Sequence, residues 1–141
     1  MRLFTKRVIK DLNDTPYLIR WSLWLPFGWS IKLHKILLPD HDRCAHDHPW
    51  SFFRMVLRGG YWETQGTSNE EVYIAPFRPM WHPAWSGFRH RITMINGPAS
   101  WSLVITGPKM FAWGFYNKSD EWKSFKDFDA LGRNRVDWCE E

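Results

Sequence analysis

The sequence predicts a single all-β domain, a sandwich or barrel, and three observations support this class. Short alternating or apolar runs recur along the chain, and Pro, Gly and Asp interrupt them at close spacing. Aromatic residues are abundant, with 11 Trp, 10 Phe and 4 Tyr among 141 residues, and these types favour half-buried sheet faces. No repeat, low-complexity segment or linker divides the chain, so we expect residues 1–141 to form one domain.

The first predicted strands precede a histidine-rich segment. Residues 17–25 (YLIRWSLWL) have the composition of a strand, and residues 26–28 (PFG) are a turn. Residues 29–38 (WSIKLHKILL) alternate over their first half, which indicates a strand with two different faces. One of these faces carries Trp29, Ile31 and Leu33, and the other carries Ser30, Lys32 and His34.

Further strands are predicted over residues 52–57, 61–64, 72–75, 88–95, 101–106 and 111–116. In residues 88–95 (FRHRITMI), strand parity places Phe88, His90, Ile92 and Met94 on one face. One helix is predicted over residues 120–131, where apolar residues recur every third position. Ser119 can cap the start of this helix, and Gly132 can end it.

Composition limits the classes of partner. The net charge is +4 and the pI is about 9.2, but the basic residues are scattered, so no nucleic-acid partner is expected. Five arginines lie in the central part of the chain and belong either to a solvated outer sheet face or to a substrate clamp. These are Arg54, Arg58, Arg78, Arg89 and Arg91.

The location of the protein is predicted to be cytoplasmic. No apolar stretch approaches the ~20 residues that a membrane span requires, and Lys6 and Arg7 stand where a signal peptide would begin its apolar segment. The two cysteines, Cys44 and Cys139, are too few for a disulfide framework in a chain of this size. We therefore expect a soluble intracellular protein that contacts no membrane.

The segment that begins at His46 (HDHPWSFFRMVLRGGYWE) raises the question of a metal site. Alternation along a strand would project His46 and His48 together, and two imidazoles at this spacing can chelate one divalent ion. The pair alone is equally typical of a surface coincidence. His90 adds to the metal interpretation, because its predicted face is apolar and the opposite face carries arginines. A buried histidine needs a partner for its ring nitrogens, which is either a metal or a polar protein group.

This arrangement resembles the two-motif pattern of the cupin superfamily. His46-x-His48, an apolar strand and Gly59-Gly60 are followed about thirty residues later by Gly87-x-x-His90. The segment is also similar to a group of small cupins of bacteria and their phages. The resemblance covers roughly residues 34–116 and implies a double-stranded β-helix, or jelly-roll barrel, with a short helix after it. It also implies a divalent metal in one mouth of the barrel, held by His46, His48 and His90.

The sequence departs from the family pattern at the positions of other motif residues. The usual Glu ligand falls on Phe52 or Phe53, the proline of the second motif is Trp85, and its asparagine is Met94. A set of three histidines would remain, as in some dioxygenases of this fold. Glu63 could supply a carboxylate from the next strand, although a surface glutamate is the commoner situation.

Other residues are candidates for supporting roles. His82 and Tyr61 are candidate catalytic groups that could move protons, and Tyr61 shares strand parity with Glu63. Arg54 and Trp50 are candidates for substrate binding. Cys44 could extend the stripe of ligands to Cys-x-His-x-His, but a loop cysteine without a metal role is the simpler interpretation.

Three functions are compatible with these features. The first is a dioxygenase-like enzyme for a small molecule with Fe(II), since three imidazoles leave open coordination positions. The second is a non-redox isomerase, epimerase or lyase, for which zinc, nickel or manganese are the alternative metals. The third is a binding or structural barrel that holds a small ligand or an assembly partner without turnover. The Trp-rich composition also predicts a homodimer.

Overall fold

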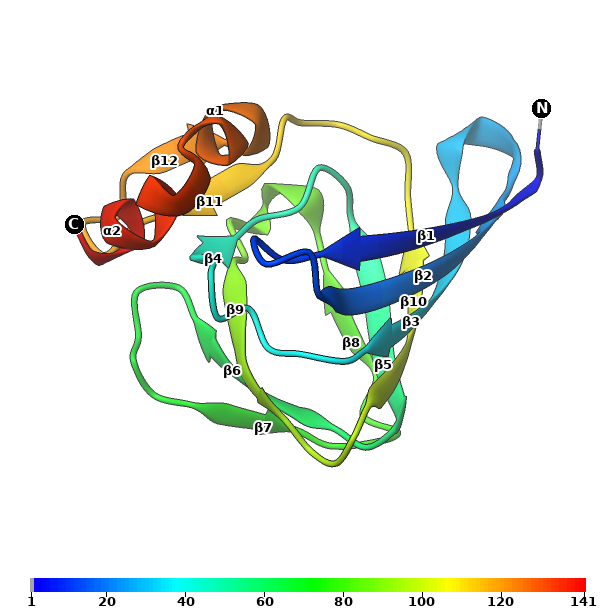
Figure 1. Cartoon of the computed structure of the whole chain (residues 1–141). Helices are drawn as coiled ribbons and strands as arrows, with labels where there is room; N and C mark the ends of the chain where they lie inside the picture. The colour runs from blue at the N-terminus through cyan, green and yellow to red at the C-terminus, as the bar shows by residue number, and fades with distance from the viewer. Residues whose placement is uncertain (1) are drawn as a thin grey trace.

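A computed structural model describes residues 2–141 as two six-stranded antiparallel sheets that face each other (Figure 1). The strand order is β1-β2-β3-β10-β5-β8 in the first sheet and β12-β11-β4-β9-β6-β7 in the second. This is the predicted jelly-roll barrel. Its elements are β1 (Phe4–Lys10), β2 (Pro16–Trp24), β3 (Ser30–Ile36), β4 (Ala45–His46), β5 (Phe52–Arg58), β6 (Tyr61–Gln65), β7 (Val72–Ile74), β8 (Met80–His82), β9 (His90–Ile95), β10 (Ser100–Thr106), β11 (Gly114–Tyr116), β12 (Trp122–Ser124), α1 (Phe125–Ala130) and α2 (Arg135–Glu140).

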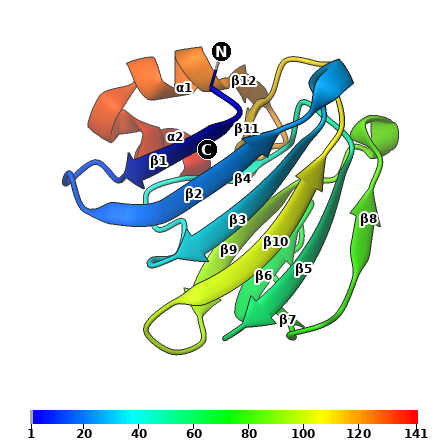
Figure 2. The ribbon, with the colours of Figure 1, turned by 90° about the vertical axis from the view of Figure 1, so that its right-hand side faces the viewer.

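The eight predicted strands are present, and the sequence analysis missed four others, which are β1, β4, β8 and β12. β1 lies at the edge of the first sheet and pairs only with β2, so most of its side chains are exposed and its pattern is weak (Figure 2). β4 and β8 are two and three residues long, too short to show a period. The short β4 is nevertheless important, because it carries His46 into the second sheet.

The predicted helix over residues 120–131 is wrong in its first part. Trp122–Ser124 form β12, which pairs with β11, so ladder hydrogen bonds at a sheet edge outweigh the helical period there. α1 begins at Phe125, and its N-cap is Ser124, whose hydroxyl accepts a hydrogen bond from the Asp127 amide at 3.2 Å. A second helix, α2, follows and was not predicted.

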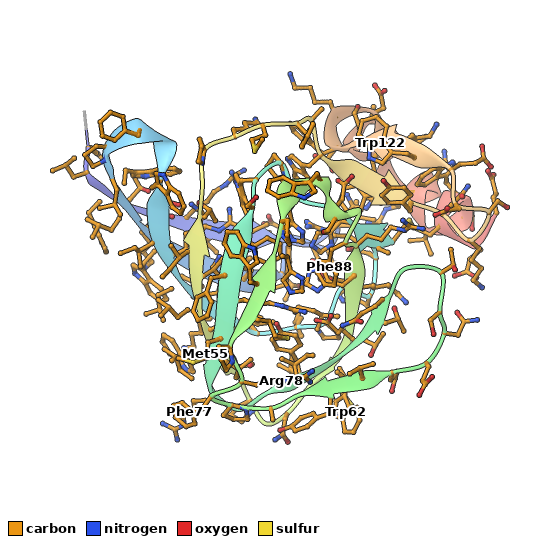
Figure 3. All side chains as sticks on the ribbon, turned by 180° about the vertical axis from the view of Figure 1, so that it is seen from behind. Met55, Trp62, Phe77, Arg78, Phe88 and Trp122 are labelled. Carbon is orange, nitrogen blue, oxygen red and sulfur yellow. A yellow bond between two sulfur atoms is a disulfide. The ribbon has the colours of Figure 1, made fainter. Side chains whose placement is uncertain are left out.

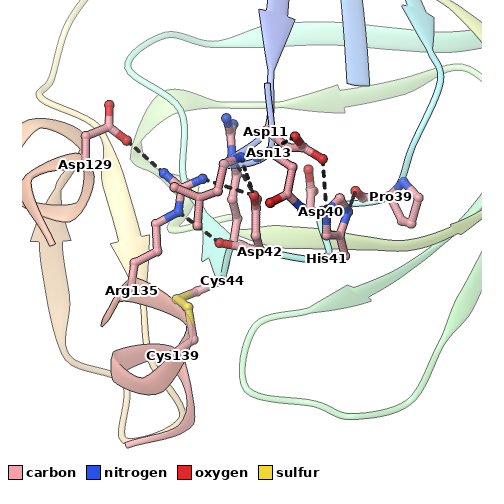
Figure 4. Close-up of polar contacts among 12 residues, drawn as sticks. Asp11, Asn13, Pro39, Asp40, His41, Asp42, Cys44, Asp129, Arg135 and Cys139 are labelled. Atoms are coloured by element: carbon pink, nitrogen blue, oxygen red, sulfur yellow. Dashed lines mark hydrogen bonds and ion pairs between the residues drawn. A yellow bond between two sulfur atoms is a disulfide. The ribbon is translucent and has the colours of Figure 1, made fainter. Parts of the chain in front are cut away.

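The two cysteines form a disulfide, which the sequence analysis did not predict. The Cys44–Cys139 bond joins the segment before β4 to α2, and Arg135 makes an ion pair with Asp42 beside it (Figure 4). Cys44 therefore has no free thiolate to offer a metal. Disulfides are rare in the cytosol, so the bond weighs against the predicted cytoplasmic location. Within residues 2–141, no helix has the length and hydropathy of a membrane-spanning segment.

Two apolar clusters hold the molecule together. One lies between the sheets around Ile36, Val56, Tyr61 and Ile74, and the other packs both helices on the second sheet. The inward face of β9 changes parity along the strand, because a register shift opposite Trp62 and Glu63 turns Met94 outward. The prediction that Met94 shares the face of His90 is therefore wrong.

Candidate metal centre

The three predicted histidines meet on the second sheet. His46 in β4 lies directly opposite His90 in β9, and His48 follows two residues after β4. The ring centroids are 4.8 Å apart for His46 and His90, 5.0 Å for His46 and His48, and 5.1 Å for His48 and His90. One ligand nitrogen from each ring lies within 4.8 Å of the other two. This grouping matches three ligands that face a common point.

The protonation of His46 and His48 suits metal binding. Burial in the barrel lowers the pKa of both His46 and His48 well below the ordinary value, and the neighbouring histidines lower it further. Both rings are therefore neutral near pH 7, which is the state that ligates metals. The Nδ1 atom of His48 is buried and has no hydrogen-bond partner among residues 2–141. A divalent ion would satisfy the group, so the residues fit a metal.

Glu63 lies beside the three histidines and outside the grouped ligand atoms. Its Oε1 is 2.9 Å from His90 Nδ1, an arrangement in which the imidazole N–H donates to the carboxylate. The same carboxylate accepts two hydrogen bonds from Arg54, at 2.5 and 3.0 Å. Although burial raises the pKa of Glu63, His90 and Arg54 lower it more, and the net shift is downward. The structure thus places Glu63 where it orients His90 and leaves the other ring nitrogen free for a metal.

Arg54 lies inside the barrel, so the solvated outer-face interpretation is wrong for this residue. It is 3% exposed and projects from β5 between the sheets. In addition to Glu63, it donates from Nε to His82 at 3.0 Å and from Nη1 to Tyr61 at 3.0 Å. Each of its three nitrogens therefore has a protein partner. The predicted role in substrate binding receives no support from these contacts.

The two candidate proton-transfer groups belong to the same network. The hydroxyl of Tyr61 is buried beneath the guanidinium of Arg54, and burial raises its pKa. The His82 ring is stacked on Phe88 at 3.8 Å between centroids. Burial, and then the charge of Arg54, lower the pKa of His82 to about 4. The shared parity of Tyr61 and Glu63 is confirmed, since both point inward from β6.

A pocket of about 430 Å³ opens beside the histidines. His48 lines it together with Trp50, Phe52 and Phe88, and Trp122 from the second sheet also contributes. Figure 3 shows Phe88 over the interior of the barrel and Trp122 at the side of β12. Phe52 occupies a position where cupins of the usual pattern carry their glutamate, and its ring lies 4.4 Å from that of His48. The pocket walls are therefore largely aromatic.

Sequence reasoning missed two features of this site. The Arg54–Glu63 ion pair is buried across two strands, and inward parity at both positions was the only signal for it. A second group of metal-type ligands, Asp11, His41 and Asp42, lies apart from the centre. Its Asp42 is already used by Arg135 and by the Leu12 amide, so this group adds no site.

Comparisons with known proteins agree with the fold. No protein-family model and no curated protein matches the sequence. Among solved structures, a cupin-2 domain protein of Rhodospirillum rubrum matches 98% of this chain and 90% of its own, at a TM-score of 0.61 and 14% identity. A putative mannose-6-phosphate isomerase of Ralstonia eutropha matches 77% of this chain and 96% of its own, at a TM-score of 0.57 and 19% identity.

The structure of FeII HppE is also similar, with a TM-score of 0.54 and 15% identity. The match covers 72% of this chain and 56% of that one, so the chain corresponds to about half of that protein. At these identities the likeness shows the fold. The chain therefore shares the fold of these cupin structures, and its three clustered histidines form a group that could hold a divalent metal.

Proposed function

We propose that this cupin is a small-molecule enzyme that uses one divalent metal, Fe(II), on His46, His48 and His90. The observation that carries the proposal is the convergence of three ligand nitrogens within 4.8 Å at the wall of an aromatic pocket. Three imidazole ligands leave open positions on an iron ion, which would supply oxygen-dependent redox chemistry when bound. The similarity to the iron form of HppE supports this choice of metal.

The chain itself would contribute positioning and a dry pocket. Glu63 fixes the orientation and tautomer of His90, and Arg54 holds the Glu63 carboxylate in place. Trp50, Phe52 and Phe88 would contact an apolar part of the substrate and limit the access of water. Trp50 is therefore the predicted substrate-binding residue whose position agrees with that role.

The contacts of His82 and Tyr61 favour the redox proposal over a proton-transferring isomerase. Nε2 of His82 accepts a hydrogen bond from Arg54, and the low pKa of this ring makes it a weak base near pH 7. The Tyr61 hydroxyl also bonds to Arg54 and is buried away from the pocket lining. Both residues are better placed to support the Arg54–Glu63 pair than to move substrate protons.

Metal analysis of purified untagged protein tests the proposal. We expect near-stoichiometric iron after anaerobic loading, and its loss in both His48→Ala and His90→Ala. His82→Ala is the matched control, because this histidine stacks on Phe88 of the pocket wall but lies outside the group of ligands. Iron-loaded wild type should then consume oxygen with a small thiol, diketone or phenol. A metal-free protein under all loading conditions would leave the non-catalytic ligand-binding barrel as the better proposal.

A homodimer is the oligomeric state that we propose. The outward faces of β2, β3 and β10 carry an almost continuous apolar surface, on which Trp21 and Trp101 stack at 5.8 Å. Leu33 and Leu103 lie opposite each other on the same surface. Apolar surface of this extent on a sheet is typical of an interface between subunits.

A further inference from the structure

The inward face of the first sheet carries a polar band at its β1 side. Strand register aligns Arg7, Arg20, His34 and Ser102 across β1, β2, β3 and β10, which lie side by side in Figure 2. The neighbouring row contains Lys32 of β3 opposite Ser22 of β2. The alternation of residues 29–38 thus places the polar residues inside, where a barrel usually carries apolar side chains.

The cations of this band have no acidic partner in the described part of the chain. Arg7, Arg20 and Lys32 form no ion pair with any carboxylate between residues 2 and 141. Lys32 is only 4% exposed, and burial, followed by the charge of Arg20, lowers its pKa to about 8. Burial also lowers the pKa of Arg20, and Arg7 adds to this effect by repulsion. Unpaired buried charges are costly, so their presence calls for a compensating anion.

Hydrogen-bond capacity in the band is also unfilled. The hydroxyl of Ser102 is buried, 2% exposed at the residue level, and has no partner among residues 2–141. The Lys32 ammonium donates to Ser30 at 2.6 Å and lies 4.3 Å from the ring centroid of Trp24, contacts that leave its charge unneutralised. Arg20 donates from Nε to His34 at 3.1 Å, and neither of its Nη atoms bonds to any of residues 2–141. Several donors therefore remain for an oxyanion.

One strand of the first sheet, β10, separates this band from the charge network of the metal centre. Val104 of β10 lies between Lys32 of β3 and Arg54 of β5, and its side chain is buried. On the β5 side, the charge of Arg54 is neutralised by Glu63. On the β3 side, the cations lack such a partner. The approach for a ligand is from β1, where Arg7 is exposed and Arg20 is partly buried.

We propose that this band, with Arg20 and Lys32 at its centre, binds an oxyanion such as a phosphate or carboxylate group. Arg20 would hold two oxygens through its free nitrogens, and Lys32 would add a point charge. Ser102 supplies a neutral donor or acceptor at the inner end. The site is independent of the metal, so it stands whether or not the proposed enzyme activity is correct.

Titration calorimetry with inorganic phosphate at constant ionic strength tests this site. We expect saturable one-to-one binding to the metal-free protein. Arg20→Met and Lys32→Met should each weaken binding by about tenfold or more, since a hydrogen bond to a charged group contributes that much. Lys6→Met is the matched control, because Lys6 neighbours Arg7 in β1 but points to the opposite face over Trp21.

Stability measurements keep the test independent of folding defects. Without phosphate, Lys32→Met should raise the melting temperature, because a buried unpaired charge is replaced by an apolar side chain of similar length. Phosphate should raise the melting temperature of the wild type and should leave that of Lys32→Met unchanged. Binding of methyl phosphate distinguishes two kinds of site. A site for the anionic end of a larger molecule should bind methyl phosphate as well as inorganic phosphate, whereas a site for the free anion should bind methyl phosphate more weakly. No saturable binding to wild type, or wild-type binding by both variants, would overturn the proposal.

Discussion

Glu63→Gln probes the buried charge network that supports the candidate metal centre. The substitution keeps the shape of the side chain and removes the charge that neutralises Arg54. Glu63 is 0% exposed and Arg54 is 3% exposed, so solvent cannot replace the lost partner. Leaving one member of a buried ion pair uncompensated costs about 3–5 kcal/mol, and the amide retains part of the hydrogen bonding, so we expect about 3 kcal/mol.

Urea unfolding of the metal-free protein measures this cost. Glu71→Gln is the control, because Glu71 is exposed and makes no ion pair within residues 2–141, and it should change stability by less than about 0.5 kcal/mol. The double variant Arg54→Met/Glu63→Gln should recover part of the loss, since it removes the stranded cation. A cost below about 1 kcal/mol for Glu63→Gln would refute the view that the pair acts as a coupled buried unit.

The same substitution should weaken metal binding. Glu63 accepts from His90 Nδ1, and removal of such an orienting group lowers metal affinity by about 10–100-fold. Competition with a chelating dye measures this affinity in wild type, Glu63→Gln and Glu71→Gln. Unchanged affinity in Glu63→Gln would show that packing alone orients His90.

Three further predictions concern pH, the disulfide and assembly. The native state lowers the pKa values of three histidines, His46, His48 and His82. The unfolded chain therefore binds more protons than the native state below pH 6.5. As a result, the stability of the metal-free protein should fall as the pH drops from 6.5 towards about 4. Equal urea midpoints at about pH 7.5 and pH 5 would contradict this. Cys44→Ser removes a cross-link between residues that are 95 positions apart in the sequence, and it should lower the free energy of unfolding by about 2–5 kcal/mol. In a melting experiment, wild type in reductant should have the same melting temperature as this variant. Sedimentation should give a dimer for wild type and a monomer for Leu103→Glu, whose charge lies on the apolar outer face; a monomeric wild type would refute the dimer.

Much of the fold was readable from local patterns. Alternation and turn residues predicted the longer strands, and the His-x-His spacing with an inward His90 predicted the cluster of histidines. Short or one-sided segments were missed, because β4 and β1 acquire their strand character from pairing with neighbours. The helix predicted from residue 120 failed for the same reason, since pairing with β11 decides the conformation of residues 122–124.

The sequence by itself predicted an all-β fold and three candidate ligands, because side-chain parity in a strand depends only on local geometry. The tertiary structure decided the partners of each charge. It placed Glu63 between Arg54 and His90 and paired Cys44 with Cys139. It also left Arg20 and Lys32 facing inward without a carboxylate partner within residues 2–141. Such pairings join strands far apart in the chain, and Coulomb and desolvation energies depend on distance and burial, which local sequence patterns do not specify.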